Sequence, residues 1–277
     1  MLVILQKNRV GESVSIAVVY GLRKKIYYWI MKHIVIMGAT SGIGLRSAEI
    51  FAKAGWQVGV AGRNETALSE LKATYPENIR SARIDVNSPE ASSELLRLID
   101  DLGGMDIYFH VSGIYSESED LIAERETAVA ETNTVGFTRM VDAAFNYFKS
   151  HGGRGRIAAV TSVAGTKGIG ALAAYSASKK YQQAYLIALS QLAHIKNLDI
   201  SVTDIRPGWI HTPLLDPDKV YPMAMSTDYA VVRIVRAIIE RRRVCVVDFR
   251  WNLLVKAWRL LPNCIWERIP LHVSIKP

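Results

Sequence analysis

The chain has 277 residues, of which 49% are hydrophobic and 9% aromatic, a composition that supports one large domain or two small ones and excludes intrinsic disorder. Its formal net charge of +8 is carried by the two ends, residues 1–32 and 231–277, whereas residues 33–230 are mildly acidic. Because this distribution offers no basic groove, we expect no nucleic-acid partner. Cys245 and Cys264 belong to no C-x-x-C pair and no histidine cluster, which argues against a metal site and indicates a reducing cytoplasm.

Residues 1–31 are interpreted as an N-terminal extension. The apolar run 14–20 is too short to span a membrane, and no signal-peptide cleavage pattern follows it. Met31 directly precedes the first convincing strand, so one interpretation is that the natural protein begins there. The alternative is a basic, aromatic surface anchor.

Residues 32–248 alternate between short apolar runs and helical patterns, which predicts one domain of strands and helices. The expected strands are 33–37, 57–61, 80–84, 106–111, 156–161, 200–205 and 244–248. Helices are expected up to Ala54, at 65–74, 89–102, 121–149 and 227–242, and around Tyr175. The alternation is typical of an α/β fold, a Rossmann-like doubly wound parallel β-sheet with helices on both faces. Such sheets bind ligands beyond the carboxyl ends of their strands.

The first strand leads into a glycine-rich turn, Gly38-Ala39-Thr40-Ser41-Gly42-Ile43-Gly44, and then into a helix. Glycines at such a turn let the backbone approach a pyrophosphate closely, and the helix N-terminus attracts its charge. A glycine-rich turn can be simple turn chemistry, but its position between strand and helix favours a dinucleotide.

The second strand ends at Gly62-Arg63-Asn64, without an acidic residue. An acid at this position binds the ribose 2′-hydroxyl of NAD(H), whereas a nearby arginine accommodates the 2′-phosphate of NADP(H). Arg63 therefore favours NADP(H), although an arginine at a strand end is often only a solvated charge.

Tyr175 and Lys179 lie four residues apart in a run of helix formers, so both should project from one helical face. An ammonium group favours the phenolate, so Lys179 is expected to lower the pKa of Tyr175 and make it an acid–base catalyst. Ser162, just after a strand, could hydrogen-bond the same substrate oxygen. Taken alone, such a Tyr–Lys pair is more often one core residue and one solvated residue.

Together these features resemble the short-chain dehydrogenases/reductases of the single-domain kind, over residues 32 to about 215. The chain matches the family's glycine fingerprint from Gly38 to Gly44, its serine thirteen residues before the tyrosine, and its Tyr-x-x-x-Lys pair. The family's Asn-x-x-Gly motif starts at Asn133. The resemblance therefore implies a catalytic tetrad of Asn133, Ser162, Tyr175 and Lys179.

The resemblance also implies which residues contact the cofactor. The family's adenine-side aspartate corresponds to Asp85, and its Pro-Gly loop begins at Pro207. The full implied set is Gly38, Thr40, Ser41, Gly42, Ile43, Gly44, Arg63, Asp85, Val86, Ser112, Gly113, Tyr175, Lys179, Pro207, Gly208, Ile210 and Thr212.

One motif departs from the family pattern. Where the family carries Asn-Asn-Ala-Gly after the fourth strand, this chain has His110-Val111-Ser112-Gly113. We interpret His110 as a hydrogen-bonding spacer within the sheet. The alternative is a titratable group near the nicotinamide.

The resemblance implies an NADP(H)-dependent oxidoreductase that interconverts a carbonyl and a secondary alcohol. In the reductive direction Tyr175 would protonate the oxygen that Ser162 polarises. Lys179 would lower the tyrosine pKa and hold the nicotinamide ribose, and Asn133 would order a water that connects Lys179 to solvent. The alternatives are a sugar-nucleotide epimerase or dehydratase and an NADP-binding regulator without turnover. The expected partners are a small carbonyl or alcohol and further copies of the chain, in a homodimer or homotetramer.

Residues 249–277 are interpreted as an amphipathic helix and tail. Pro262 ends the helix, and its apolar stripe comprises Trp251, Leu254, Trp258 and Leu261. We expect this stripe to pack on its own subunit or a partner and to cover the mouth of the pocket. The alternative is peripheral contact with an anionic membrane, aided by the basic cluster at 241–243.

Overall fold

The computed structural model describes residues 6–7, 13–14 and 33–271. Most of the N-terminal extension, including Met31, therefore lies outside the described residues. Within it, β1 (Gln6–Lys7) pairs antiparallel with β2 (Ser13–Val14), and this pair is separate from the main sheet.

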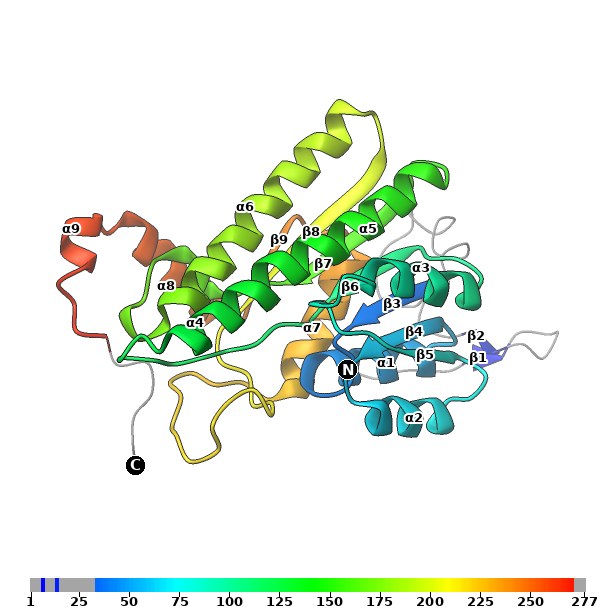
Figure 1. Cartoon of the computed structure of the whole chain (residues 1–277), viewed down its shortest axis with the longest axis horizontal. Helices are drawn as coiled ribbons and strands as arrows, with labels where there is room; N and C mark the ends of the chain where they lie inside the picture. Colours follow the sequence, from blue (N-terminus) through cyan, green and yellow to red (C-terminus); the bar gives the residue numbers. More distant parts are fainter. Residues whose placement is uncertain (1–5, 8–12, 15–32, 272–277) are drawn as a thin grey trace.

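The main sheet of the described chain has seven parallel strands in the order β5-β4-β3-β6-β7-β8-β9 (Figure 1). The strands are β3 (His33–Met37), β4 (Gln57–Gly62), β5 (Ile79–Arg83), β6 (Ile107–His110), β7 (Arg154–Val160), β8 (Asp199–Pro207) and β9 (Val244–Val247). The chain order reverses direction between β3 and β6, so the expected doubly wound Rossmann-like fold is confirmed. In such a sheet this reversal point is where a ligand crevice opens.

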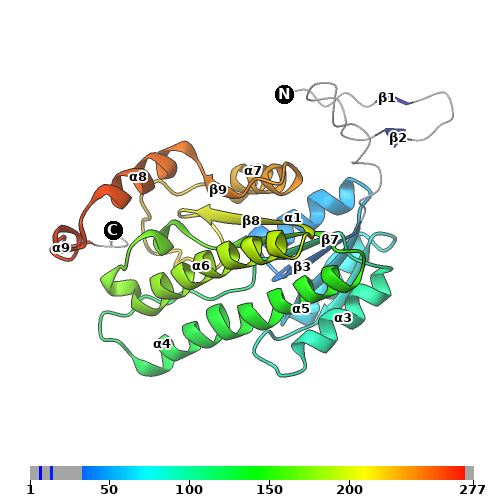
Figure 2. The same ribbon diagram turned by 90° about the horizontal axis from the view of Figure 1, so that it is seen from above.

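Helices cover both faces of the sheet, as Figure 2 shows from above. One face packs against α1 (Gly42–Lys53), α2 (Glu65–Thr74), α7 (Thr227–Ile239) and α8 (Phe249–Leu260). The other packs against α3 (Ala91–Leu102), α5 (Phe137–Ser150) and α6 (Ala173–Ile195). Because both faces are covered, β3 and β6 are buried along almost their whole length, which explains their continuous apolar sequences.

The helix expected at 121–149 is interrupted. It consists of α4 (Ala123–Ala130), a π-helical turn η2 (Glu131–Gly136) and α5. In a regular α-helix the Phe137 N–H would bond the carbonyl four residues back, but here it donates to Thr132 O, five residues back, and to Thr134 O, three residues back. Gly136 also lies against the loop that follows β5, since a Cβ on Gly136 would be 2.8 Å from Val86 Cγ2. The sequence pattern did not reveal this turn because α and π segments share the same apolar face.

The C-terminal segment packs on its own domain. In α8 the side chains of Trp251 and Val255 are buried, and α9 (Asn263–Trp266) follows directly after Pro262. Both views place α8 and α9 beside the first turns of α6 (Figures 1 and 2). The expected intramolecular packing of the stripe is thus confirmed. Among the described residues, no helix is long and apolar enough to cross a membrane.

Candidate active site

A cavity of about 580 Å³ opens at the carboxyl ends of the strands. Nearly all the residues that the sequence assigned to a site line it, although they come from seven separate segments. Those present are Gly38, Thr40, Ser41, Gly42, Ile43, Arg63, Asp85, Val86, Ser112, Gly113, Ser162, Tyr175, Lys179, Pro207, Gly208, Ile210 and Thr212. Gly44 and Asn133 lie behind this wall and act on it indirectly.

The turn between β3 and α1 is closely packed and needs its glycines. Gly38 has φ +92°, and a Cβ there would lie 2.6 Å from Ser112 N. A Cβ on Gly44 would lie 2.0 Å from Gly38 O, so this glycine lets α1 approach the strand. The side chain of the N-cap residue Ser41 makes no capping hydrogen bond to α1, and Ser41, Gly42 and Ile43 line the cavity. This turn therefore fits a pyrophosphate.

The ends of β4 and β5 form one end of the cavity. Arg63 is exposed there, while Asn64 caps α2 by accepting a hydrogen bond from Ala67 N–H at 3.2 Å. Asp85 accepts a hydrogen bond from Asn87 N–H at 3.0 Å. Among the described residues that line the cavity, the charged ones are Arg63, Asp85 and Lys179.

Ser162, Tyr175 and Lys179 converge on the opposite part of the cavity. Ser162 follows β7 and caps the short helix η3 (Val163–Thr166), where its Oγ accepts a hydrogen bond from Ala164 N–H at 3.1 Å. Tyr175 lies in the first turn of α6, within hydrogen-bonding reach of Ser162. Lys179 Nζ lies 5.6 Å from the centroid of the Tyr175 ring. The spacing of four residues has placed both groups on one helical face, as expected.

The pKa of Tyr175 does not follow the expectation. Burial raises the pKa of Tyr175 to about 12, and the hydrogen bond with Ser162 offsets only part of this rise. Lys179 donates to Val160 O and Gln182 Oε1, each at 3.1 Å, and these bonds hold its ammonium group 5.6 Å from the centroid of the Tyr175 ring. The expected lowering of the Tyr175 pKa by Lys179 is therefore wrong for the protein chain alone. The free energy that the phenolate loses by leaving water outweighs any stabilisation by the lysine.

Burial lowers the pKa of Lys179 to about 8, although the carboxylate of Asp204 acts in the opposite direction. At neutral pH the site accordingly presents a neutral phenol beside a lysine that is largely charged. A neutral phenol is a proton donor, which suits protonation of a substrate oxygen.

Asn133 is fully buried in the π turn and braces the neighbouring loop. Its Oδ1 accepts from Ile114 N–H at 2.9 Å, and its Nδ2 donates to Ile114 O at 2.8 Å. Its backbone oxygen accepts from Gln182 Nε2 at 2.8 Å. The adjacent Gln183 donates to Ser162 O at 2.7 Å. The sequence reasoning missed both glutamines, although their spacing of three and four residues from Lys179 places them on the same side of α6.

His110 lies within the sheet and does not line the cavity. Its Nδ1 is 2.9 Å from the hydroxyl of Tyr108, and its ring packs edge-on against Phe137. Burial and the charge of Lys179 lower the pKa of His110 to about 3. A neutral, buried ring agrees with the interpretation as a hydrogen-bonding spacer and not with that of a titratable group at the nicotinamide.

The family model for short chain dehydrogenases matches residues 32–219. The chain therefore belongs to the short-chain dehydrogenase family. An uncharacterized oxidoreductase of Mycobacterium tuberculosis is 32% identical over 85% of this chain and 96% of the relative, and one of Myxococcus xanthus is 28% identical over 84% and 94%. The similarity of this short-chain dehydrogenase to these two oxidoreductases therefore covers nearly their full length.

Solved structures share the fold of this short-chain dehydrogenase. Actinorhodin polyketide ketoreductase with NADPH is 29% identical, with a TM-score of 0.61 over 66% of this chain and 72% of that chain. A Burkholderia cenocepacia short chain dehydrogenase in complex with NADP has a TM-score of 0.74 and 19% identity, covering 87% and 98%. A Burkholderia phymatum structure in complex with NAD has a TM-score of 0.74 and 18% identity, covering 87% and 97%.

Beyond Tyr175, the cavity of this short-chain dehydrogenase is walled by aromatic rings. Tyr115 meets Tyr175 edge-on at 5.1 Å and Trp209 at 5.9 Å between ring centroids. From the C-terminal segment, α8 contributes Trp251, Leu254 and Trp258. Trp251 Nε1 donates to Met223 O at 3.3 Å, so its polar atom is satisfied by the protein. This wall therefore presents apolar surface.

Hydrogen bonds fasten the C-terminal segment to the loop between Ser162 and Tyr175. Lys167 Nζ donates to Leu261 O at 2.8 Å and to Asn263 Oδ1 at 2.6 Å. Trp266 Nε1 donates to Gly168 O at 2.6 Å. Gly208 allows the close approach of α8, since a Cβ there would lie 2.0 Å from the Trp251 ring. Three residues of the expected stripe, Trp251, Leu254 and Trp258, therefore line the cavity.

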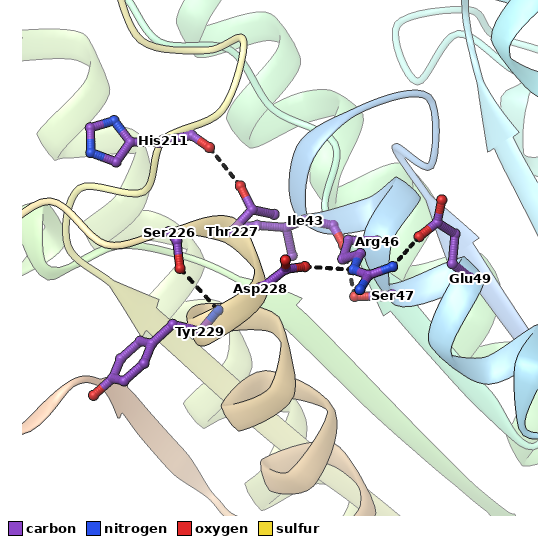
Figure 3. Close-up of polar contacts among 9 residues, drawn as sticks. All are labelled: Ile43, Arg46, Ser47, Glu49, His211, Ser226, Thr227, Asp228 and Tyr229. Carbon is purple, nitrogen blue, oxygen red and sulfur yellow. Dashed lines mark hydrogen bonds and ion pairs between the residues drawn. The ribbon is translucent and has the colours of Figure 1, made fainter.

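The loop that follows β8 is hydrogen-bonded to the start of α7, which in turn is paired with α1 (Figure 3). Ser226 caps α7, and Thr227 Oγ1 donates to His211 O at 2.5 Å. Arg46 of α1 donates to Asp228 at 2.6 Å and also pairs with Glu49. Glu117 and Lys219 form an ion pair at 3.0 Å that connects the loops on either side of the cavity. These contacts join the loop after β8 to α7 and to the loop after β6, and join α7 to α1.

Proposed function

We propose that this short-chain dehydrogenase is an NADP(H)-dependent oxidoreductase that interconverts a carbonyl and a secondary alcohol. The observation that carries the proposal is the convergence of Ser162, Tyr175 and Lys179 on a cavity that the β3–α1 glycine turn also lines. An acid–base group and a pyrophosphate-binding turn at one cavity are what hydride transfer from a dinucleotide requires.

When bound, NADPH would supply the hydride. The chain supplies the rest of the chemistry. Tyr175 donates its phenolic proton to the developing alkoxide, and the Ser162 hydroxyl donates a hydrogen bond to the same oxygen. Lys179 has three N–H donors, of which two are used for Val160 O and Gln182 Oε1. The third is available to the nicotinamide ribose.

NADP(H) is proposed over NAD(H) because of Arg63. It lies at the end of β4 beside the cavity, and the residues around it, Gly62 and Asn64, carry no acid. A guanidinium group binds a 2′-phosphate through charge-assisted hydrogen bonds. The remaining residues of the implied set, from Asp85 and Val86 to the 207–212 loop, would contact the adenine and nicotinamide halves.

The substrate proposed is a neutral, largely apolar carbonyl compound. The part of the cavity beyond Tyr175 is lined mainly by apolar groups, among them the rings of Tyr115, Trp209 and Trp258. Among the described lining residues, Lys179 is the charged one near this part. This distinguishes the proposal from its alternatives. A sugar-nucleotide epimerase or dehydratase needs cationic groups for a second pyrophosphate, and a regulator without turnover gives no reason to keep the whole tetrad.

NADPH consumption tests the proposal, with a panel of neutral aryl and alkyl ketones, charged keto acids and nucleotide sugars. We expect turnover with neutral ketones and a marked loss in Tyr175→Phe. Turnover confined to nucleotide sugars would favour the epimerase alternative, and NADPH binding without any turnover would favour the regulator. A cytoplasmic location and a homodimer or homotetramer complete the proposal.

A further inference from the structure

Gln182 connects two groups of the proposed tetrad inside the protein. Its side chain is fully buried in the third turn of α6. Its Oε1 accepts a hydrogen bond from Lys179 Nζ at 3.1 Å, and its Nε2 donates to the backbone oxygen of Asn133 at 2.8 Å. The family resemblance implies that Asn133 orders a water connecting Lys179 to solvent, whereas here the Gln182 side chain joins Lys179 to Asn133.

The chemistry of its partners fixes the orientation of this amide. The Asn133 carbonyl can only accept a hydrogen bond, and the Lys179 ammonium can only donate. Reversing the amide would place its NH₂ against the ammonium and its oxygen against the carbonyl. Gln182 must therefore present its oxygen to Lys179.

The π turn prepares the Asn133 carbonyl for this contact. In an α-helix this carbonyl would accept from the Phe137 N–H, but that N–H donates to Thr132 O. The carbonyl is thereby released from its usual α-helical donor and bonds Gln182 across the interface of η2 and α6. The π turn thus leaves the Asn133 carbonyl open to the hydrogen bond that the buried Gln182 donates.

We propose that Gln182 is a positioning residue that fixes the Lys179 ammonium group and stabilises its charged form by tying it to the Asn133 carbonyl. The inference rests on the proposed function, since it assigns Lys179 its role beside Tyr175. The Val160 carbonyl supplies the second acceptor at 3.1 Å. With two N–H donors held, the third remains for a ligand in the cavity that Lys179 lines.

The other ionisable groups around Lys179 do not replace Gln182. On α6, Tyr175 is neutral at physiological pH, since burial raises its pKa to about 12. From β6, His110 is uncharged above its pKa of about 3. From β8, Asp204 favours the charged lysine, but both its oxygens are engaged, with Thr161 at 2.6 Å and Arg206 at 2.5 Å and 2.8 Å. Gln182 is therefore the nearest side-chain acceptor of the ammonium group.

Two substitutions at this position have opposite expected effects. Gln182→Met keeps the length of the side chain but removes both hydrogen bonds, so the pKa of Lys179 should fall by about one unit. Gln182→Glu keeps an acceptor for Lys179 and adds a negative charge, so the pKa should rise. Gln183→Met is the matched control, because it removes a buried amide that holds Ser162 O and not Lys179.

The lysine can be titrated without turnover, by NMR of the ¹³Cε-labelled lysines with Lys179→Met as the assignment reference. The dissociation constant of NADPH is measured against pH in parallel, together with the pH profile of kcat. We expect the basic limb of the profile and the Lys179 titration to move down in Gln182→Met and up in Gln182→Glu. In Gln183→Met the pH at which kcat declines on the basic side should stay unchanged, even if kcat itself falls.

Equal titrations of Lys179 in the wild type and both Gln182 variants would overturn the inference, as would shifts in the same direction. Shifts of opposite sign without any carbonyl turnover would support the role of Gln182 while refuting the proposed reaction. If Gln182→Met fails to fold, Gln182→Glu alone tests the inference: a rise in the pKa of Lys179 supports it, and a fall or no change overturns it. We expect kcat in Gln182→Met to fall about tenfold or more, with KM changed less.

Discussion

At the residue scale, the site depends on what burial does to two side chains. Tyr175 is expected to stay protonated across the physiological range because its phenolate would be poorly hydrated, whereas Lys179 titrates near pH 8. Lys179 is charged below that pH and loses its charge above it. Reductive turnover should therefore decline as the pH rises through about 8, and kcat measured from pH 6 to 10 checks this.

Tyr175→Phe preserves the ring but removes the proton donor. We expect turnover to fall by at least about a hundredfold, while NADPH still binds, because the glycine turn and Lys179 remain. Stopped-flow or steady-state NADPH consumption measures the first effect and fluorescence titration the second. Near-normal turnover would refute the assignment of Tyr175.

Arg63→Ala tests the cofactor preference. Loss of a charge-assisted contact should weaken NADPH binding by about 1–3 kcal/mol and leave NADH binding nearly unchanged. Arg83, which is exposed and pairs with Glu65 at 3.4 Å, offers a control in Arg83→Ala. Equal affinity of the wild type for NADPH and NADH would contradict the preference.

At the element scale, α8 has two distinct faces. Its inner face, with Trp251 and Val255, is buried, and Trp258 lines the cavity. Its outer face carries Leu253 and Leu260, which are 70% and 84% exposed. Substitution of Trp258 would therefore disturb the cavity and could not isolate membrane contact. Leu253 is the position that separates the two roles.

We expect the protein to stay unbound in flotation with anionic liposomes at physiological salt. The tryptophans that would anchor an interfacial helix are already packed on the domain, and the exposed face of a helix of 12 residues offers little apolar area. Leu253→Glu should leave both turnover and flotation unchanged. Flotation of the wild type that disappears in Leu253→Glu would establish the membrane contact instead.

At the scale of the whole molecule, all residues proposed for the catalytic site lie within residues 33–271. Its cavity is built from the ends of the sheet strands, from α6 and from α8. A chain that begins at Met31 should therefore fold, bind NADPH and retain activity, with a thermal unfolding temperature close to that of the full chain. Insolubility or loss of NADPH binding would show that the extension is structural.

The sequence by itself determined the order of strands and helices and the chemistry of the local motifs. Short apolar runs specify most of the buried parallel strands, and the spacing of Tyr175 and Lys179 specifies a shared helical face, since both depend only on local periodicity. The glycines between Gly38 and Gly44 were interpretable for the same reason. These features need no knowledge of distant contacts.

Only the tertiary structure decided how these residues are surrounded. The high pKa of Tyr175 arises from burial by segments far away in the chain, and the role of Gln182 depends on a carbonyl 49 residues earlier. The π turn that releases this carbonyl leaves no mark in the apolar pattern. The position of the C-terminal segment likewise depends on Lys167, which bonds Leu261 O, and on Gly208, which lies against Trp251, and both contacts form only on folding. Desolvation and hydrogen-bond partners are properties of the packed molecule, and local sequence patterns do not encode them.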